Sequence, residues 1–317
     1  MGSTNRETLT GSAASLKVND LHTRVQEREL VNMVMSPEYI KAYLRLPEIS
    51  KNRVDMTTFT NRVDLATDIT RVNQKLSAIN DPDKKYDEGE KEALIMSDVL
   101  EGLLFDKIAN GKLFGENVKA AMPSIYDDLF LGNDLILEQS NDGFYSYSGL
   151  GIDITFGNNN SLKKMEIIRR KILKGQAGSI KYFLSPDGNI KGSQDNIAIF
   201  VIGLDRSNMF KATQAWNGDS KSFDAKIKSE ILWQMLAQCK YFQKTILNHL
   251  AKNRNTLNEY NVFQLKNVLS IYQAEEKRIE KIIKDTGTNI SATDEVSKSL
   301  MLFMEKRDDM SDSLFRD

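Results

Sequence analysis

Two short apolar segments of the chain each contain one charged residue at an inner position. Asp153 stands in "GIDITFG" and Lys181 stands in "SIKYF". A carboxylate and an ammonium group on neighbouring strands suit metal-dependent phosphodiester chemistry, because the carboxylate binds a hard cation and the ammonium group stabilises charge on a phosphate. They also suit an ordinary sheet with a structural ion pair at its rim. The sequence leaves both interpretations open.

The segments that must position these charges are predicted to be strands. They are short, rich in β-branched and aromatic residues, and bounded by Gly, Asn, Asp or Pro, and they span residues 134–140, 144–157, 179–185 and 196–205. The "NDG" at 141–143 predicts a hairpin turn, because these residues tolerate positive φ. The continuous apolar run "IAIFVIGL" in the last segment is typical of a central strand that is covered on both faces.

Helical periodicity dominates the rest of the chain. Apolar residues recur at steps of three and four over residues 63–79, 89–109, 161–174, 223–250, 261–285 and 292–306. We therefore predict an α/β (α+β) fold, with a central mixed sheet of about four to five strands flanked by helices and helical extensions at both ends. The predicted divisions are a disordered tail at 1–20, an N-terminal helical region at 21–87, a core at 88–250 and a C-terminal helical region at 251–317.

The order of these elements resembles the PD-(D/E)XK nuclease superfamily, which has the restriction-endonuclease-like fold. The resemblance lies in a helix, a hairpin, a strand with a central Asp ("GIDIT") and a strand with a central Lys ("IKYF"), and it covers about a third of the chain. It implies that Asp153 binds Mg²⁺, or Mn²⁺ in its place. It also implies that Lys181 positions or activates the attacking water in a metal-dependent nuclease acting on DNA or RNA.

One position departs from the family's pattern. The acid expected two residues before the lysine is Ser179 here, and a neutral hydroxyl is a poor ligand for Mg²⁺. Asp134 and Glu138 offer replacements, because residues four apart in a strand point to the same face. We therefore predict that Asp134 or Glu138 completes the metal shell beside Asp153. Other acids that could reach the site are Asp127, Asp128, Glu92 and Glu101.

The helix predicted at 161–174 is strongly basic. Its apolar residues can cover a sheet while its cations face outward, where they could hold the phosphate backbone of a substrate. The predicted substrate-binding residues are Lys163, Lys164, Arg169, Arg170 and Lys174. The other interpretation is an ordinary solvated helix surface.

Bulk composition narrows the function classes. The 317 residues include one cysteine and two histidines, which argues against a disulfide framework, a thiolate or imidazole zinc site and a Ser-His-Asp triad. With 43 basic and 44 acidic residues the net charge is −1, which argues mildly against a non-specific nucleic-acid binder. We expect no membrane partner and a cytoplasmic, reducing compartment, although export without a classical signal stays open.

Two alternatives to a nuclease remain at this stage. The first is a non-catalytic interaction protein that uses a nuclease-like core as a scaffold and binds a protein partner through its terminal helices. The second is a module that binds nucleic acid through residues 161–174 without cleaving it. A nuclease requires Asp153 to lie close to another acid, and this requirement separates it from both alternatives.

Overall fold

The structure is a computed structural model that describes residues 36–79, 81, 88–111, 113–139, 149–156, 158–218 and 221–309. The tail predicted at 1–20 and the hairpin turn predicted at 141–143 lie outside these residues. Within them, no helix is long and apolar enough to cross a lipid bilayer.

A five-stranded mixed sheet forms the centre of the described structure. Its strands are β1 (Val118–Ala121), β2 (Leu135–Gln139), β3 (Gly149–Phe156), β4 (Gly178–Leu184) and β5 (Lys191–Leu204). The spatial order is β1-β2-β3-β5-β4. The first three strands are antiparallel neighbours, β3 and β5 are parallel, and β4 and β5 are antiparallel. The predicted fold class is confirmed, whereas the prediction that the Asp153 and Lys181 strands are adjacent is wrong, because β5 lies between them.

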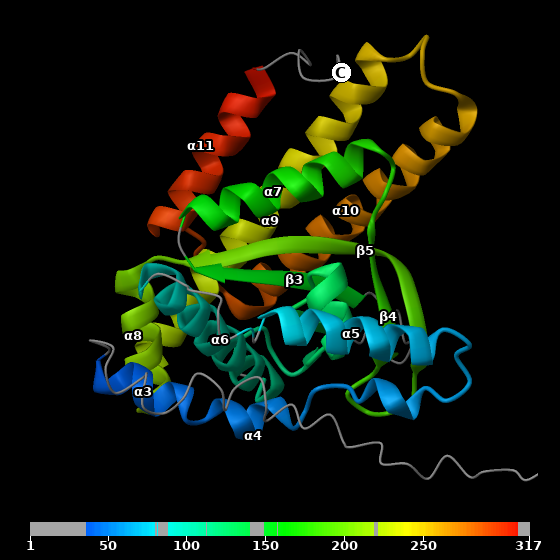
Figure 1. The fold of residues 1–317 in the computed structure, drawn as a ribbon. Helices are drawn as coiled ribbons and strands as arrows, with labels where there is room; N and C mark the ends of the chain where they lie inside the picture. The colour runs from blue at the N-terminus through cyan, green and yellow to red at the C-terminus, as the bar shows by residue number, and fades with distance from the viewer. Residues whose placement is uncertain are drawn as a thin grey trace, which may run out of the picture.

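Helices surround this sheet, with α7 on one side of it and α6 on the other (Figure 1). The helical elements are α3 (Pro37–Tyr43), α4 (Leu46–Ser50), η1 (Met56–Thr58), α5 (Leu65–Ile79), α6 (Glu88–Ala109), η2 (Asp127–Leu131), α7 (Asn158–Leu173), α8 (Arg206–Asn217), α9 (Lys221–Lys252), α10 (Glu259–Thr286) and α11 (Glu295–Asp309). One hydrophobic cluster includes residues from Tyr39 to Met304 and contains buried residues of both β3 and β5. The terminal helices therefore share the core of the sheet.

The second half of β5 extends beyond β4, and side chains from α9 and α10 cover its free edge. Gln238 bonds both the N–H and the C=O of Val201, at 2.9 and 2.7 Å. Gln234 does the same for Gly203, at 3.0 and 2.8 Å. The Tyr272 hydroxyl completes the series at the backbone of Ile199. Buried backbone groups need such partners, and an uncovered strand edge would invite pairing with another chain.

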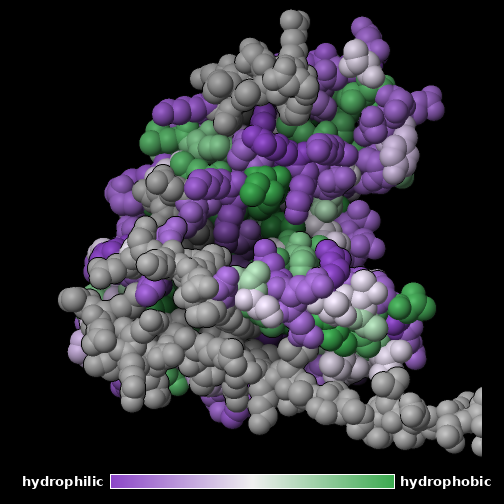
Figure 2. All heavy atoms as spheres, viewed as in Figure 1, coloured by the Kyte–Doolittle hydropathy of each residue, from purple (hydrophilic) through white to green (hydrophobic). Residues whose placement is uncertain are grey.

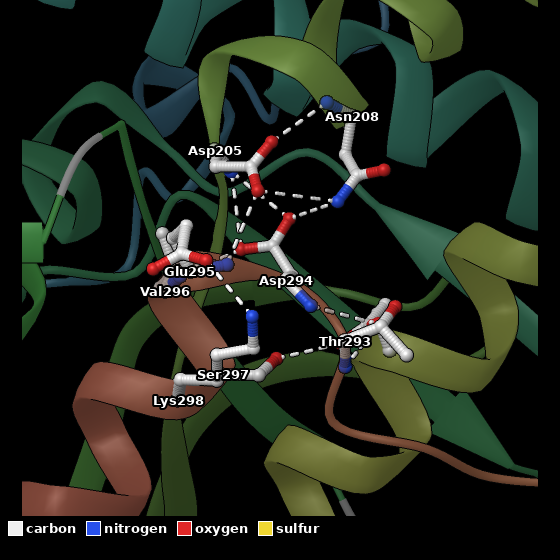
Figure 3. Close-up of polar contacts among 9 residues, drawn as sticks. Asp205, Asn208, Thr293, Asp294, Glu295, Val296, Ser297 and Lys298 are labelled. Carbon is white, nitrogen blue, oxygen red and sulfur yellow. Dashed lines mark hydrogen bonds and ion pairs between the residues drawn. The ribbon is translucent and has the colours of Figure 1, made fainter.

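The start of α11 is tied to the start of α8 by reciprocal caps, which Figure 3 shows in detail. The Asp205 carboxylate accepts from the backbone N–H groups of Asn208 and Glu295, and the Asp294 carboxylate accepts from those of Asp205 and Val296. Behind them, the buried Glu230 of α9 accepts from the backbone N–H groups that precede α11. Each carboxylate satisfies N–H groups that a helix start leaves without partners. The result is a C-terminal helix anchored to the end of β5.

Candidate functional site

Two carboxylates meet at the point where β2 begins. The β2–β3 pairing starts at Leu135 and Ile152, and Asp134 is the residue just before it. The Asp134 N–H donates to the Ile152 carbonyl at 2.8 Å, which holds Asp134 against the residue that precedes Asp153 on β3. Both carboxylates also contact the same lysine, Lys164. The entry into β2 therefore brings together the two acids that were predicted to share a metal.

Lys164 of α7 is the cation at this pair. Its Nζ donates to Oδ1 of Asp153 and, at 2.7 Å, to the carbonyl of Ile154, and it lies 4.0 Å from Oδ2 of Asp134. That Oδ2 in turn accepts from the Ile154 N–H at 2.5 Å. Lys164 was predicted to bind substrate on the outer face of its helix. It instead points inward to the carboxylates.

Burial governs the electrostatics of the three groups. The side chains of Asp134 and Asp153 are only 17% and 16% exposed. Loss of water raises the pKa of both carboxyls, and the charge of Asp153 raises that of Asp134 further, while Lys164 lowers both. Burial alone would lower the Lys164 pKa, but the two carboxylates outweigh it and raise it above the usual lysine value. Lys164 is therefore an ammonium group at neutral pH, and it lies between two acids whose charged forms burial disfavours.

A glycine lets the chain turn closely past this pair. Gly132 ends the η2 turn with φ of +73°, a conformation that side chains with a Cβ rarely adopt. A Cβ added there would lie 3.6 Å from Oδ2 of Asp153. The turn from η2 into β2 can thus pass beside the carboxylate and deliver Asp134 two residues later.

A buried ion triad adjoins the carboxylate pair. Arg53, from the segment after α4, donates to Asp128 of η2 at 2.8 Å and to Glu101 of α6 at 3.1 Å. Its side chain is only 6% exposed, and its Nε has no hydrogen-bond partner among the described residues. Burial raises the pKa of Glu101 well above the usual range and raises that of nearby Asp98 to about 7. The charge of Asp128 also raises the pKa of both Asp134 and Asp153, so this triad contributes negative potential at the carboxylate pair.

Lys181 lies in a different cluster, which corrects the prediction that it serves Asp153. Its Nζ bonds the carboxylates of Asp64, at 2.6 Å, and Asp68 on α5, and it lies 4.8 Å from the centre of the Tyr126 ring. Asp68 also accepts from the Tyr182 hydroxyl at 2.7 Å. This cluster joins the N-terminal segment to β4. Ser179 belongs to β4 as well, so β5 separates both Ser179 and Lys181 from the strand that carries Asp153.

Glu138 does not join the pair either, although it alternates onto the same face as Asp134. Four residues of strand separate the two by about 14 Å. Glu138 is buried and lies opposite Lys119 in the β1–β2 pair. Burial raises the Glu138 pKa, and the charge of Asp187 raises it further. The prediction that it could complete the metal shell is wrong, because that distance exceeds the reach of a shared ion.

The four other acids considered are also placed. Asp127 is buried and accepts from the backbone N–H groups of Lys181 and Tyr182, whereas Glu92 pairs with Arg206. Asp128 and Glu101 both accept hydrogen bonds from Arg53 in the triad that adjoins the carboxylate pair. The residue that sequence reasoning missed entirely is Arg53. Among the described residues, no group of three or more Asp, Glu, His or Cys side chains is arranged to hold a metal ion.

The donor set can nevertheless fit one hard cation. Magnesium commonly takes one or two protein carboxylates and fills its other positions with water and substrate phosphate oxygens. Asp134 and Asp153 supply two carboxylates that meet at one lysine. Comparison of the chain with protein-family models, with curated proteins and with solved structures gave no match. The argument for function therefore rests on this geometry.

Proposed function

We propose that the chain is a divalent-metal-dependent nuclease, or a descendant of one, that hydrolyses phosphodiester bonds in DNA or RNA. The observation that carries the proposal is the convergence of Asp134 and Asp153 on the Lys164 ammonium group. In the proposed site, Asp134 and Asp153 would hold Mg²⁺ or Mn²⁺. Such an ion supplies charge neutralisation at a phosphate and lowers the pKa of a bound water.

Each side chain then has a role that follows from its state. Lys164 is protonated, so it cannot accept a proton from water, but its ammonium group can donate to a phosphate oxygen as negative charge develops there. The Ile154 carbonyl and Asp153 fix its direction. Arg53 holds Asp128 and Glu101 beside the pair. Their charges favour a cation at the pair over a second anion.

The resemblance to the PD-(D/E)XK superfamily supports the proposal in a revised form. The family's acidic strand corresponds to β3, and Asp134 at the start of β2 serves as the second acid. The cation comes from α7 in place of the predicted Lys181. This arrangement uses three sequence-adjacent elements in one corner of the sheet.

The test is a cleavage assay on plasmid, single-stranded DNA and RNA with Mg²⁺ or Mn²⁺, and with EDTA as the metal-free control. We expect Asp134→Asn, Asp153→Asn and Lys164→Met to abolish metal-dependent cleavage. Lys181→Met, the same substitution at the other buried-cluster lysine, should retain cleavage at temperatures where it remains folded. The two lysine variants distinguish a site that uses Lys164 from the site predicted around Lys181.

Metal binding has a readout that is independent of activity. A cation that binds only the folded state stabilises it by about 2.7 kcal/mol at a concentration of 100 times its Kd. Mg²⁺ or Mn²⁺ should therefore raise the melting temperature of the wild type and have no effect on Asp153→Asn. Absence of both cleavage and the metal-dependent shift in a folded wild type would refute the proposal and favour a scaffold that binds a protein partner through the terminal helices.

A further inference from the structure

The solvent side of α7 carries a stripe of cations that starts beside the carboxylate pair. Lys163, Arg170, Lys171 and Lys174 are exposed, with the exposed Ile167 among them. Their spacing places them on one side of a helix that turns once every 3.6 residues. Lys171 is two turns beyond Lys164, so it lies on the same edge of the helix, about 10 Å further along its axis.

The structure divides the cations of this helix into separate groups. Lys164 points to the carboxylates, and Arg169 is largely buried, with Glu166 at 3.7 Å. Glu166 also pairs with Arg170 at 3.0 Å. Lys163, Lys171 and Lys174 form no ion pair with another described residue. Of the predicted substrate-binding set, Lys163 and Lys174 thus remain as exposed and unneutralised cations, and Lys171 joins them.

The dimensions of the stripe fit a nucleic acid strand. From Lys163 to Lys174 the helix rises about 16 Å, which matches about five nucleotides at 3.4 Å per nucleotide of one strand. A lipid surface fits poorly, because Ile167 is one apolar residue among cations and membrane-surface helices need an apolar face. Figure 2 shows hydrophilic side chains gathered over α7 and a hollow below it, toward β3.

We propose that Lys163, Lys171 and Lys174 hold the phosphate backbone of a nucleic acid strand that runs along α7 and presents a phosphodiester to Asp134 and Asp153. The inference rests on the proposed function for the identity of the ligand class. It adds the direction of the strand's path, which follows the helix from Lys164 toward Gly175. Lys171 and Lys174 also lie near the C-terminus of α7, where cations favour the helix dipole, but that role affects stability and not ligand binding.

The test measures binding of labelled 20-nucleotide DNA and RNA strands to the full chain by fluorescence anisotropy in EDTA, between 50 and 200 mM salt. Each phosphate contact contributes about 0.7 to the slope of log K against log salt for a single strand. The triple variant Lys163→Gln, Lys171→Gln, Lys174→Gln should therefore lose about 2 from that slope. At 0.1 M salt its affinity should fall on the order of 100-fold.

The matched control is Lys277→Gln, Lys281→Gln, Lys284→Gln, which removes the same charge from an exposed stripe on α10. It should keep the wild-type slope. An unchanged slope in the α7 variant, an equal loss in both variants, or no binding by the wild type would overturn the inference. Because binding is measured without metal, its outcome is independent of cleavage, and failure of this inference can be told from failure of the proposed nuclease activity.

Discussion

Removal of the Arg53 guanidinium should destabilise the chain more than any surface change of charge. Arg53→Met preserves most of the volume of the side chain but leaves Asp128 and Glu101 without their shared cation. Loss of one partner from a buried ion pair costs about 3–5 kcal/mol. We expect the lower end, about 3 kcal/mol, because the Asp128 and Glu101 side chains keep 26% and 15% exposure to solvent.

The assay is urea unfolding followed by circular dichroism. With a slope of about 3 kcal/mol per molar urea, a loss of about 3 kcal/mol lowers the midpoint by about 1 M. The matched control is Arg170→Met, because the Arg170 side chain is 65% exposed in an i,i+4 pair with Glu166. Such a surface pair contributes about 0.3–0.5 kcal/mol, so the control midpoint should hardly move.

The pH dependence of the deficit tests its cause. Burial already raises the pKa of Glu101 in the wild type, and the lost guanidinium should raise it further. A carboxyl whose folded pKa is raised favours the folded state at low pH and disfavours it as pH rises through that pKa. The deficit of Arg53→Met should therefore shrink between pH 8 and pH 5, and addition of Glu101→Gln should restore part of the stability. A midpoint within 0.3 M of that of Arg170→Met at pH 8 would refute this account of the triad.

Three further predictions concern other buried or paired groups. Asp98→Asn should be more stable than the wild type at pH 8 and equal to it near pH 4 in thermal unfolding, because the difference between the Asp98 pKa of about 7 and the ordinary 3.8 corresponds to about 4 kcal/mol at most. Gln238→Leu should lower the free energy of unfolding by about 2–4 kcal/mol in urea and speed amide exchange at Val201, since two buried backbone groups would lose their partner. Unchanged exchange would argue that the Gln238 side chain does not cover the edge of β5. Asp64→Asn should lower stability at pH 6 and match the wild type near pH 2. Hydrogen bonds from Lys181 and Arg62 lower the Asp64 pKa to about 2, and their contribution to stability is lost as pH falls toward that value. An equal deficit at both pH values would contradict this.

The strands and long helices were predictable because burial leaves a periodic record in the sequence. The alternating and continuous apolar runs correspond to β2, β3, β4 and β5, and the three- and four-residue steps correspond to α5, α6, α7, α9, α10 and α11. The strand β1 was missed because its four residues, "VKAA", include two alanines with little strand preference. The helix α8 was missed because it follows β5 directly, with only the Asp205 cap between them.

The position of β4 shows where sequence order misleads. Consecutive strands are often spatial neighbours, so β4 was placed beside β3. The continuously apolar β5 is buried on both faces, and such a strand belongs in the interior of a sheet. Strand β5 therefore lies between β3 and β4, and it separates Lys181 on β4 from Asp153 on β3.

Lys164 had a signal in the sequence, whereas Arg53 had none. Lys164 lies one turn before the buried Ile168 and next to the buried Met165, so the helical period places it at the border of the face that packs on the sheet. A lysine at that border needs an acid below it. Arg53 reaches the site because the chain after α4 runs parallel to the residues that follow β1, where Arg53 and Met122 form an isolated bridge and the Val54 N–H donates to the Met122 carbonyl. No local pattern records a contact of that kind.

The carboxylate pair contains more acids than a structural role requires. One lysine needs one carboxylate, and either Asp134 or Asp153 alone would satisfy Lys164. The chain instead brings both acids together in a buried position, where burial and the charge of Asp153 raise the pKa of Asp134. Local conflicts of this kind are expected where a fold is adapted to a function and not to its own stability. A divalent cation at the pair would favour the ionised form of both acids and could also contact a phosphate, so the second acid favours the proposed nuclease over a structural ion pair.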